Sequence, residues 1–521
     1  MNSSIRKVAA ALGVLLAAAF LNLNFVQVVK GSDYRNAPDN QRVLLNEYAS
    51  PRGQIIVGGG TGTAIATSIA TKDELKYLRE YPQGPLYAPI TGFYSITATP
   101  SPYLGTEGIE KYEDSVLSGS DSRLFGRRLA DILTGRNPRG GSVEVTVDAA
   151  TQQAAYNAMK GSDGKMRAGA VVAIDPTTGA ILAAVSTPSY NPSELSLHDS
   201  GKIRDYYAAL TNDRAQPLQN RDFNQLYFPG STFKIVVSAA AIKAGYTPST
   251  DIPAPNGYIA STGQGVSSCH GDVINCVQNF EGEKCYDGTK ATLAYAFAKS
   301  CNTAFAELAV DELHGDAIAN EAKLFGFDPN NQLTVPMPVA NSTLGPTGDL
   351  IDPGKLAHIA FGQQSVGMTP LQAAMLSAAV ANGGTLMRPY LVDKELAPDL
   401  SVLKQTKPSV FNQVLSVSQD QLLMQMMEGV VTSPEGTGGS AALPGYTVGG
   451  KTGTADTGAT SDTNVQPDAW FTGFALQGNT PRIAVAVIIE NAGVNGNEVT
   501  GGKAAAPVAR AVMAAYLKAH P

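Results

Sequence analysis

Residues 227–234 read YFPGSTFK, and this stretch decides the fold. Ser231 and Lys234 stand at positions i and i+3, so on a helix their side chains project from the same face and the amine can reach the hydroxyl. The Pro-Gly pair before Ser231 is typical of a helix start, where backbone N–H groups favour developing negative charge. A serine hydroxyl needs a neighbouring base to act as a nucleophile. We therefore predict a nucleophilic serine with a lysine as its base.

Two further motifs follow in the chain, SCN at residues 300–302 and KTG at residues 451–453. The first comes after an alanine-rich stretch at residues 289–299, and we expect it to end that helix in a loop that faces a cleft. The second lies in YTVGGKTGT at residues 446–454, which indicates a strand. Glycine in a strand often marks the close approach of another backbone, here an extended peptide that pairs along the strand edge.

Each motif alone has an ordinary explanation: a solvated helix face, a polar helix terminus or a turn. The same patterns also occur at residues 4–7 (SIRK) and 189–191 (SYN), where no such chemistry is expected. The order and spacing of the three motifs favour the chemical interpretation, because they supply a nucleophile, two amines and a second hydroxyl. Lys234 must be neutral to accept a proton, and burial or the charge of Lys451 would lower its pKa accordingly.

The N-terminus indicates export. Arg6 and Lys7 precede an uncharged stretch at residues 8–29, which is long enough to span a bilayer. Positive charge before it predicts a cytoplasmic tail at residues 1–7, a transmembrane signal anchor at 8–29 and the bulk of the chain outside, in the cell membrane. The alternative is a signal peptide cleaved near residues 17–19, but the apolar run continues past that position.

Composition agrees with a large exported enzyme. The 521 residues leave room for two or three domains, 16% of the residues are charged, and the net charge of −7 gives no electrostatic footprint for nucleic acid.

Four cysteines lie close together, and an exported protein favours disulfides over the alternative of a zinc site with His270. Four cysteines allow three pairings, among which sequence does not choose. A free thiol at Cys301, between two candidate catalytic residues, would be an oxidation liability. We expect Cys301 to be bridged, with Cys285 as the preferred partner and Cys269–Cys276 as the second bond. The loop that carries Cys285 must then fold back along the helix expected at residues 289–299, so that Cys285 comes close to Cys301.

The three motifs are the set found in penicillin-binding proteins and class A β-lactamases, and the chain resembles the small type of class B penicillin-binding protein. The resemblance extends to GAVVAIDP at residues 169–176, EGTG at 435–438 and WFTG at 470–473. Upstream, RGQI at residues 52–55 and GIE at 108–110 resemble motif boxes of the same class. The resemblance to this class covers about residues 40 to 518 and is most specific from residue 169 onward.

The resemblance implies an α+β fold: a penicillin-binding/serine β-lactamase-like transpeptidase domain with an antiparallel five-stranded sheet flanked by helices. An all-helical part would separate the first strands from the last three. The sequence pattern agrees, with strands near residues 170–186 and 446–491, helices over 205–385 and an alanine-rich helix from Lys503. We place the transpeptidase domain at residues 161–521 and a small pedestal or docking domain at 30–160, which lacks the acidic motifs of a glycan polymerase.

The implied activity is a peptidoglycan D,D-transpeptidase. Ser231 would attack the carbonyl between two terminal D-alanines of a stem peptide, Lys234 would accept the proton, and Ser300 would relay a proton to the leaving amine. The backbone N–H groups of Ser231 and Thr454 would form the oxyanion hole. β-Lactams would acylate the same serine. No metal or organic cofactor is required, and a membrane glycan polymerase is the expected protein partner.

The remaining motif residues would hold the substrate. Asn302 would bind its amide, and its terminal carboxylate would lie on the KTG strand, against Lys451, Thr452, Gly453 and Thr454.

Three alternatives share some of these residues. A class A β-lactamase would need a Glu-x-x-Leu-Asn box between Asn302 and Lys451, and the sequence has none. A D,D-carboxypeptidase would use the same residues but transfer the acyl group to water. A penicillin-binding sensor or division scaffold would not need Lys451.

Overall fold

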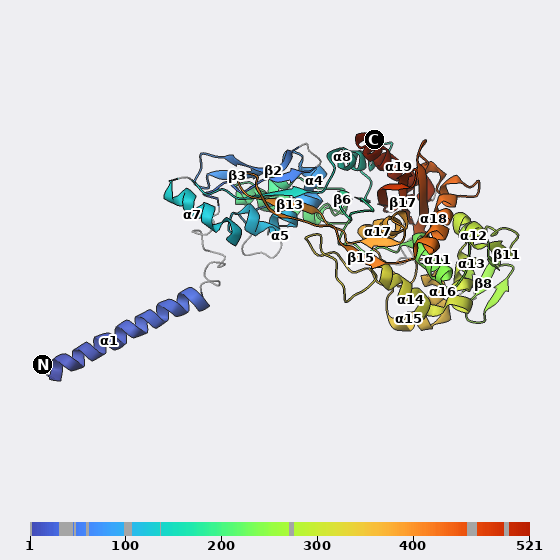
Figure 1. Ribbon diagram of the computed structural model, residues 1–521, viewed down its shortest axis with the longest axis horizontal. Coiled ribbons are helices and arrows are strands. Elements are labelled where there is room, and N and C mark those ends of the chain that lie inside the picture. The colour runs from blue at the N-terminus through green and yellow to red at the C-terminus, as the bar shows by residue number, and fades with distance from the viewer. Residues whose placement is uncertain are drawn as a thin grey trace.

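The computed structural model describes residues 3–30, 45, 48–58, 62–97, 107–135, 137–269, 276–455, 466–493 and 500–521. The chain begins with α1 (Ser3–Asn24), which η1 (Phe25–Val29) continues. Together they form a helix long and apolar enough to cross a membrane, and it projects from the folded body (Figure 1). Of the expected cytoplasmic tail, Met1 and Asn2 lie outside the described residues.

The catalytic part is built on a five-stranded antiparallel sheet with the order β16-β17-β18-β5-β6. The expected fold class is confirmed, with two early strands and three late ones in a single sheet. The strands are β5 (Gly169–Ile174), β6 (Ile181–Thr187), β16 (Thr447–Ala455), β17 (Asp468–Gln477) and β18 (Thr480–Ile489).

Both faces of this sheet are buried, because side chains alternate along each strand and both sides are apolar. On β18, Ala484, Ala486 and Ile488 join the core that contains α11 and α17. Ile483 and Val485, on the opposite face, pack with the C-terminal helix α19. The covering helices are α8 (Ala149–Ala158), α11 (Lys234–Lys243), α17 (Pro370–Ala381), α18 (Val417–Thr432) and α19 (Gly501–Ala519).

The segment between β6 and β16 contains the helices expected there, together with short strands that the sequence did not predict. Strands this short carry too weak an alternation to be recognised. The helices are α9 (Pro192–Leu195), α10 (Ser200–Asn212), η3 (Gly230–Phe233), α12 (Leu293–Lys299), α13 (Asn302–Glu307), η5 (Leu308–Leu313), α14 (His314–Phe325), α15 (Thr347–Ile351) and α16 (Pro353–Ile359). The strands are β7 (Asp251–Pro253), β8 (Gly257–Ile259), β9 (Gln264–Val266), β10 (Cys276–Gln278), β11 (Lys290–Thr292), β12 (Thr385–Met387) and β15 (Val410–Gln413).

The N-terminal part has its own six-stranded sheet, with the order β14-β13-β4-β1-β2-β3. Two of its strands, β13 and β14, come from far along the chain. They join this sheet through the pairing of β13 with β4. The division of the chain at residue 160 therefore stays a prediction, and residues 392–405 belong structurally to the N-terminal sheet. The elements are β1 (Ile55–Val57), β2 (Thr63–Ala70), β3 (Tyr77–Glu80), β4 (Ser142–Val145), β13 (Val392–Leu396), β14 (Val402–Gln405), α4 (Gly84–Thr91), α5 (Gly108–Tyr112), α6 (Asp114–Leu117), η2 (Ser122–Leu124) and α7 (Phe125–Leu133).

A buried ionic cluster holds this part together and joins the two upstream motif boxes. Glu110 is fully buried and accepts hydrogen bonds from Arg52 Nε at 2.5 Å and Arg79 Nε at 2.6 Å. Tyr81 donates its hydroxyl to the same carboxylate at 3.1 Å. Burial would raise the pKa of Glu110, but the two guanidinium groups outweigh it and lower that pKa.

We predict that Glu110→Ala lowers the free energy of unfolding by about 3–5 kcal/mol, because it leaves the buried Arg79 guanidinium without a counter-charge and Arg52 with only Asp114. The matched control is Asp114→Ala, which removes a half-exposed carboxylate that also pairs with Arg52, at 2.6 Å. Its cost should stay below about 1 kcal/mol. Urea unfolding followed by circular dichroism measures both, and equal losses would contradict the assignment.

Candidate active site

Ser231 is the second residue of η3, which begins at Gly230 and leads directly into α11, so the helix start expected at the Pro-Gly pair is present. Gly230 has φ of +54°, a conformation that suits glycine, and a Cβ there would lie 2.7 Å from the carbonyl oxygen of Thr454. The backbone N–H of Gly230 donates to Gly362 O at 3.0 Å. The serine turn is therefore held directly against strand β16.

Lys234 is fully buried on the first turn of α11. Its Nζ donates to Ser300 O at 2.7 Å, to Ser300 Oγ at 3.3 Å and to Asn302 Oδ1 at 2.8 Å. Within the described part of the chain, Ser231 is not among its hydrogen-bond partners. Burial, followed by the nearby charge of Lys451, lowers the pKa of Lys234 well below its ordinary value. This lysine is thereby suited to be a neutral base.

Lys451 approaches the same hydroxyl from the opposite side. It is fully buried on β16, and its Nζ donates to Ser300 Oγ at 2.9 Å and to Thr452 O at 3.0 Å. Burial lowers the pKa of Lys451 to about 7. Two amines from separate elements thus converge on the hydroxyl of Ser300, a convergence that the sequence did not predict.

Ser300 ends α12, as the sequence predicted, and does so in the left-handed conformation with φ of +68°. That conformation is uncommon for a residue with a side chain and is characteristic of functional sites. The N–H of Cys301 bonds to Ala296 O at 2.9 Å and closes the helix end. Asn302 then begins α13, so the SCN motif is a tight connection between two helices.

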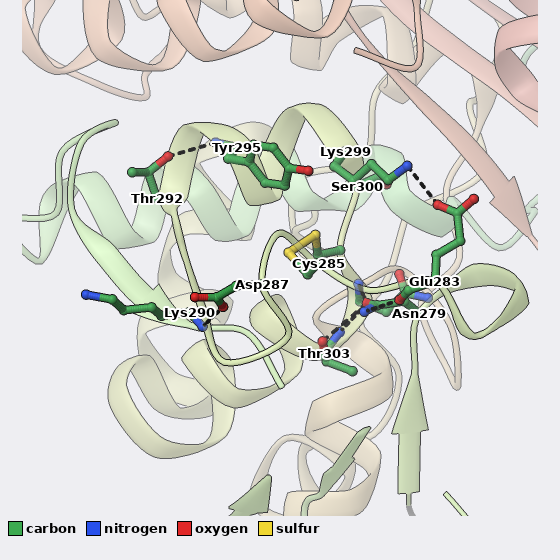
Figure 2. Close-up of a disulfide and its surroundings, with 12 residues drawn as sticks. Asn279, Glu283, Cys285, Asp287, Lys290, Thr292, Tyr295, Lys299, Ser300 and Thr303 are labelled. Carbon is green, nitrogen blue, oxygen red and sulfur yellow. Dashed lines mark hydrogen bonds and ion pairs between the residues drawn. A yellow bond between two sulfur atoms is a disulfide. The ribbon is translucent and has the colours of Figure 1, made fainter. Parts of the chain in front are cut away.

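The Cys285–Cys301 disulfide links this connection covalently to the loop that precedes α12. Its Cα atoms are 5.8 Å apart, and the second bridge is Cys269–Cys276, which is the pairing expected from the sequence. Figure 2 shows that the loop carrying Cys285 folds back along α12, where Glu283 meets Lys299 in an ion pair of 2.8 Å. His270, the remaining ligand of the zinc alternative, lies outside the described residues.

Two further residues support the site and were not predicted. Asn279 Oδ1 accepts hydrogen bonds from the N–H groups of Asn302 at 2.7 Å and Thr303 at 3.1 Å, so it caps α13 from a distant loop (Figure 2). Thr437 Oγ1 lies 2.5 Å from Thr452 Oγ1. The EGTG run contained Thr437, but neither residue has a local pattern that reveals its partner.

Strand β16 forms the edge of the catalytic sheet, and the KTG motif lies within it. A Cβ at Gly453 would lie 2.9 Å from Pro229 O, so glycine allows the serine turn to approach the strand. Ser231 and Thr454, the expected oxyanion-hole pair, thus stand on adjoining segments. A cavity of about 390 Å³ opens beside Asn302, with Phe228, His358 and Phe361 in its wall.

Comparison with known proteins agrees with this geometry. Residues 169–514 match the family described as "Penicillin binding protein transpeptidase domain", and residues 52–143 match "Penicillin binding protein A dimerisation domain". The chain therefore belongs to the penicillin-binding protein transpeptidases, and it is of class B.

Several of its most similar relatives are D,D-transpeptidases or penicillin-binding proteins named A. The chain is 42% identical to the peptidoglycan D,D-transpeptidase PbpA of Mycolicibacterium smegmatis over 99% of both chains. It is 40% identical to PbpA of Mycobacterium tuberculosis over 100% of both. Penicillin-binding protein A from M. tuberculosis, solved as a ceftriaxone acyl-enzyme complex, has 38% identity and a TM-score of 0.81, and the match covers 91% of this chain and 100% of that one.

We predict that replacing both Cys285 and Cys301 by serine slows acylation by penicillin about tenfold, equivalent to about 1.4 kcal/mol of barrier, because Ser300 loses its fixed position. The matched control replaces Cys269 and Cys276, a bridge that does not include a residue of the SCN motif, and should cost less. Stopped-flow acylation together with thermal unfolding measures both variants. A rate loss that merely follows the loss of stability, or alkylation of Cys301 in the unreduced protein, would contradict the prediction.

Proposed function

We propose that this chain is a peptidoglycan D,D-transpeptidase that acts through an acyl-enzyme on Ser231. The observation that carries the proposal is the convergence of two buried amines, Lys234 and Lys451, on the hydroxyl of Ser300. This arrangement moves protons between nitrogen and oxygen without histidine or metal ligands, which is what acyl transfer at a serine requires.

In the acylation step, Ser231 Oγ attacks the carbonyl carbon between the two terminal D-alanines of a stem peptide. Its proton passes to neutral Lys234, and the oxyanion is stabilised by the N–H groups of Ser231 and Thr454. The C–N bond then breaks. Ser300 passes a proton to the leaving D-alanine amine and is reprotonated by Lys234, which holds the proton taken from Ser231. Protons and charge therefore balance.

The substrate is held between α13 and β16. Asn302 binds the peptide amide, and the terminal carboxylate meets Lys451, Thr452 and Thr454, with Gly453 leaving room for the backbone. The contact between Thr437 and Thr452 supports this, because it fixes the threonine hydroxyl that faces the carboxylate. An amine of a second stem peptide then attacks the acyl-enzyme and forms the cross-link. A β-lactam replaces the dipeptide and stays attached to Ser231.

The catalytic part works outside the cell membrane, attached through α1 as a single-pass anchor. The charge of Arg6 and Lys7 before the apolar helix supports this orientation. A membrane glycan polymerase is the expected partner, since residues 30–160 carry none of the acidic motifs of a glycan polymerase and cross-linking needs glycan strands supplied beside the transpeptidase.

One assay distinguishes a transpeptidase from the two alternatives, a D,D-carboxypeptidase and a non-catalytic sensor or scaffold. We predict that purified protein given a D-Ala-D-Ala substrate and an acceptor amine forms the amide product. Free acid would instead indicate a carboxypeptidase, and no product would indicate a sensor or scaffold.

Ser231→Ala should form neither product and lose labelling by fluorescent penicillin while remaining folded. A penicillin adduct on another serine, found by mass spectrometry, would refute the nucleophile.

We predict a bell-shaped pH dependence of kcat/KM. On the acid side, activity falls as pH drops through the lowered pKa of Lys234, because the protonated amine cannot accept the serine proton. On the alkaline side, it falls above the Lys451 pKa of about 7, because the neutral amine binds a carboxylate less well. Lys451→Arg should shift the alkaline limb upward, since guanidinium keeps its charge.

Lys234→Arg is the matched variant for the acid limb and should be nearly inactive at every pH, because guanidinium does not release its proton. Near-normal acylation by this variant would show that Lys234 serves only as a charge.

A further inference from the structure

Helix α7 (Phe125–Leu133) carries a concentrated apolar face. Phe125, Leu129, Ile132 and Leu133 fall within one arc of roughly 100° on the helix. These four side chains, which we call the α7 face, are between 45% and 78% exposed. None of the helix's residues is buried, whereas Leu124, immediately before it, is 2% exposed. A surface helix of a globular protein normally turns such a face toward the core.

The polar side of α7 faces the protein instead. Arg127, opposite the α7 face, pairs with Asp399 at 2.5 Å and donates to Ser401 at 3.1 Å. Arg123, in the preceding turn, pairs with Asp121 at 2.7 Å and also with Glu395. These contacts hold the helix to the β13–β14 hairpin by ion pairs.

A groove separates the rest of α7 from the N-terminal sheet. It has a volume of about 1420 Å³, and Arg127, Ala130 and Asp131 line one side of it while Gln54 and Thr67 line the other. The helix is thus supported by charged contacts, and none of the four side chains of the α7 face belongs to a hydrophobic core of the described residues. Leu400, at the tip of the hairpin that holds α7, is also 60% exposed.

The position of this helix indicates what covers the α7 face. Figure 1 shows α7 at the end of the molecule away from the catalytic sheet, toward the end from which α1 projects. The chain between Lys30 and Tyr48 reaches at most roughly 60 Å, so an anchored α1 keeps the N-terminal part near the bilayer. Arg128 is exposed at the border of the apolar arc, where it suits an anionic headgroup.

A second copy of the chain fits this surface less well. Residues 52–143, which include α7, match a family named for dimerisation. A stable protein interface, however, needs roughly 800 Å² from each partner, and the α7 face has only four apolar side chains. A membrane has no such requirement when a transmembrane anchor already holds the protein, because tethering makes a weak second contact effectively intramolecular.

We propose that α7 lies in the outer surface of the membrane, with the α7 face among the acyl chains and Arg128 at anionic headgroups, as a second attachment that orients the N-terminal part. The proposal rests on the anchor function of α1. It is independent of the reaction at Ser231.

The test uses the full-length protein in vesicles of phosphatidylcholine and phosphatidylglycerol. Leu133→Cys, labelled with an environment-sensitive fluorophore, should show a blue-shifted spectrum and quenching by spin-labelled lipid. Ile351→Cys, an exposed apolar position on α15 in the catalytic part, is the matched control and should show neither. Adding Leu129→Glu and Ile132→Glu should abolish the Leu133→Cys signal while penicillin labelling stays unchanged. Vesicles of phosphatidylcholine alone should give weaker quenching.

Separate readouts distinguish the possible failures. Flotation with vesicles reports the anchor, and penicillin labelling reports the active site. A chain that floats while the Leu133 probe stays as water-exposed as the Ile351 probe overturns the proposal. Energy transfer between labelled copies that persists in detergent and is lost on adding Leu129→Glu and Ile132→Glu also overturns it, in favour of self-association through the α7 face. A chain that does not float overturns both the anchor and this proposal, whatever its penicillin labelling.

Discussion

Two lysine amines buried beside one hydroxyl are the constraint on which the rest of this structure depends. Lys234 and Lys451 have only hydroxyl, carbonyl and amide oxygens as hydrogen-bond partners in the described part of the chain, and no ion pair. Burying two like charges without a carboxylate is costly, so the site favours loss of a proton. That penalty keeps an amine available as a base, and the protein must hold it in place through packing.

The packing is supplied by three elements that are far apart in sequence. Helix α11 carries one amine, edge strand β16 carries the other, and the connection between α12 and α13 carries the shared hydroxyl. Glycines at residues 230 and 453 allow the serine turn to touch the strand, and the disulfide at Cys301 fastens the connection. Together these contacts hold the polar side chains of the site in fixed positions, as preorganisation requires.

The N-terminal part follows a different logic. Its interior is held by the ionic cluster around Glu110, and its far end presents apolar side chains outward on α7. Strands β13 and β14 follow catalytic helices in the sequence but belong to the N-terminal sheet. The N-terminal part is therefore built partly from the catalytic segment of the chain. The orientation of the catalytic cleft is therefore linked to whatever the N-terminal end contacts.

The sequence by itself determined the chemistry and part of the fold: the SxxK, SCN and KTG motifs, the two early and three late strands of the catalytic sheet with helices between them, and the apolar N-terminal helix. These signals are local, since residue spacing sets helix faces and alternation sets strand faces. Only the tertiary structure decided the roles of Asn279 and Thr437, the pairing of β13 with β4, and the outward direction of the α7 face. Periodicity shows that a helix has an apolar side, but which side faces the protein depends on partners such as Asp399, which are distant in sequence and leave no local pattern.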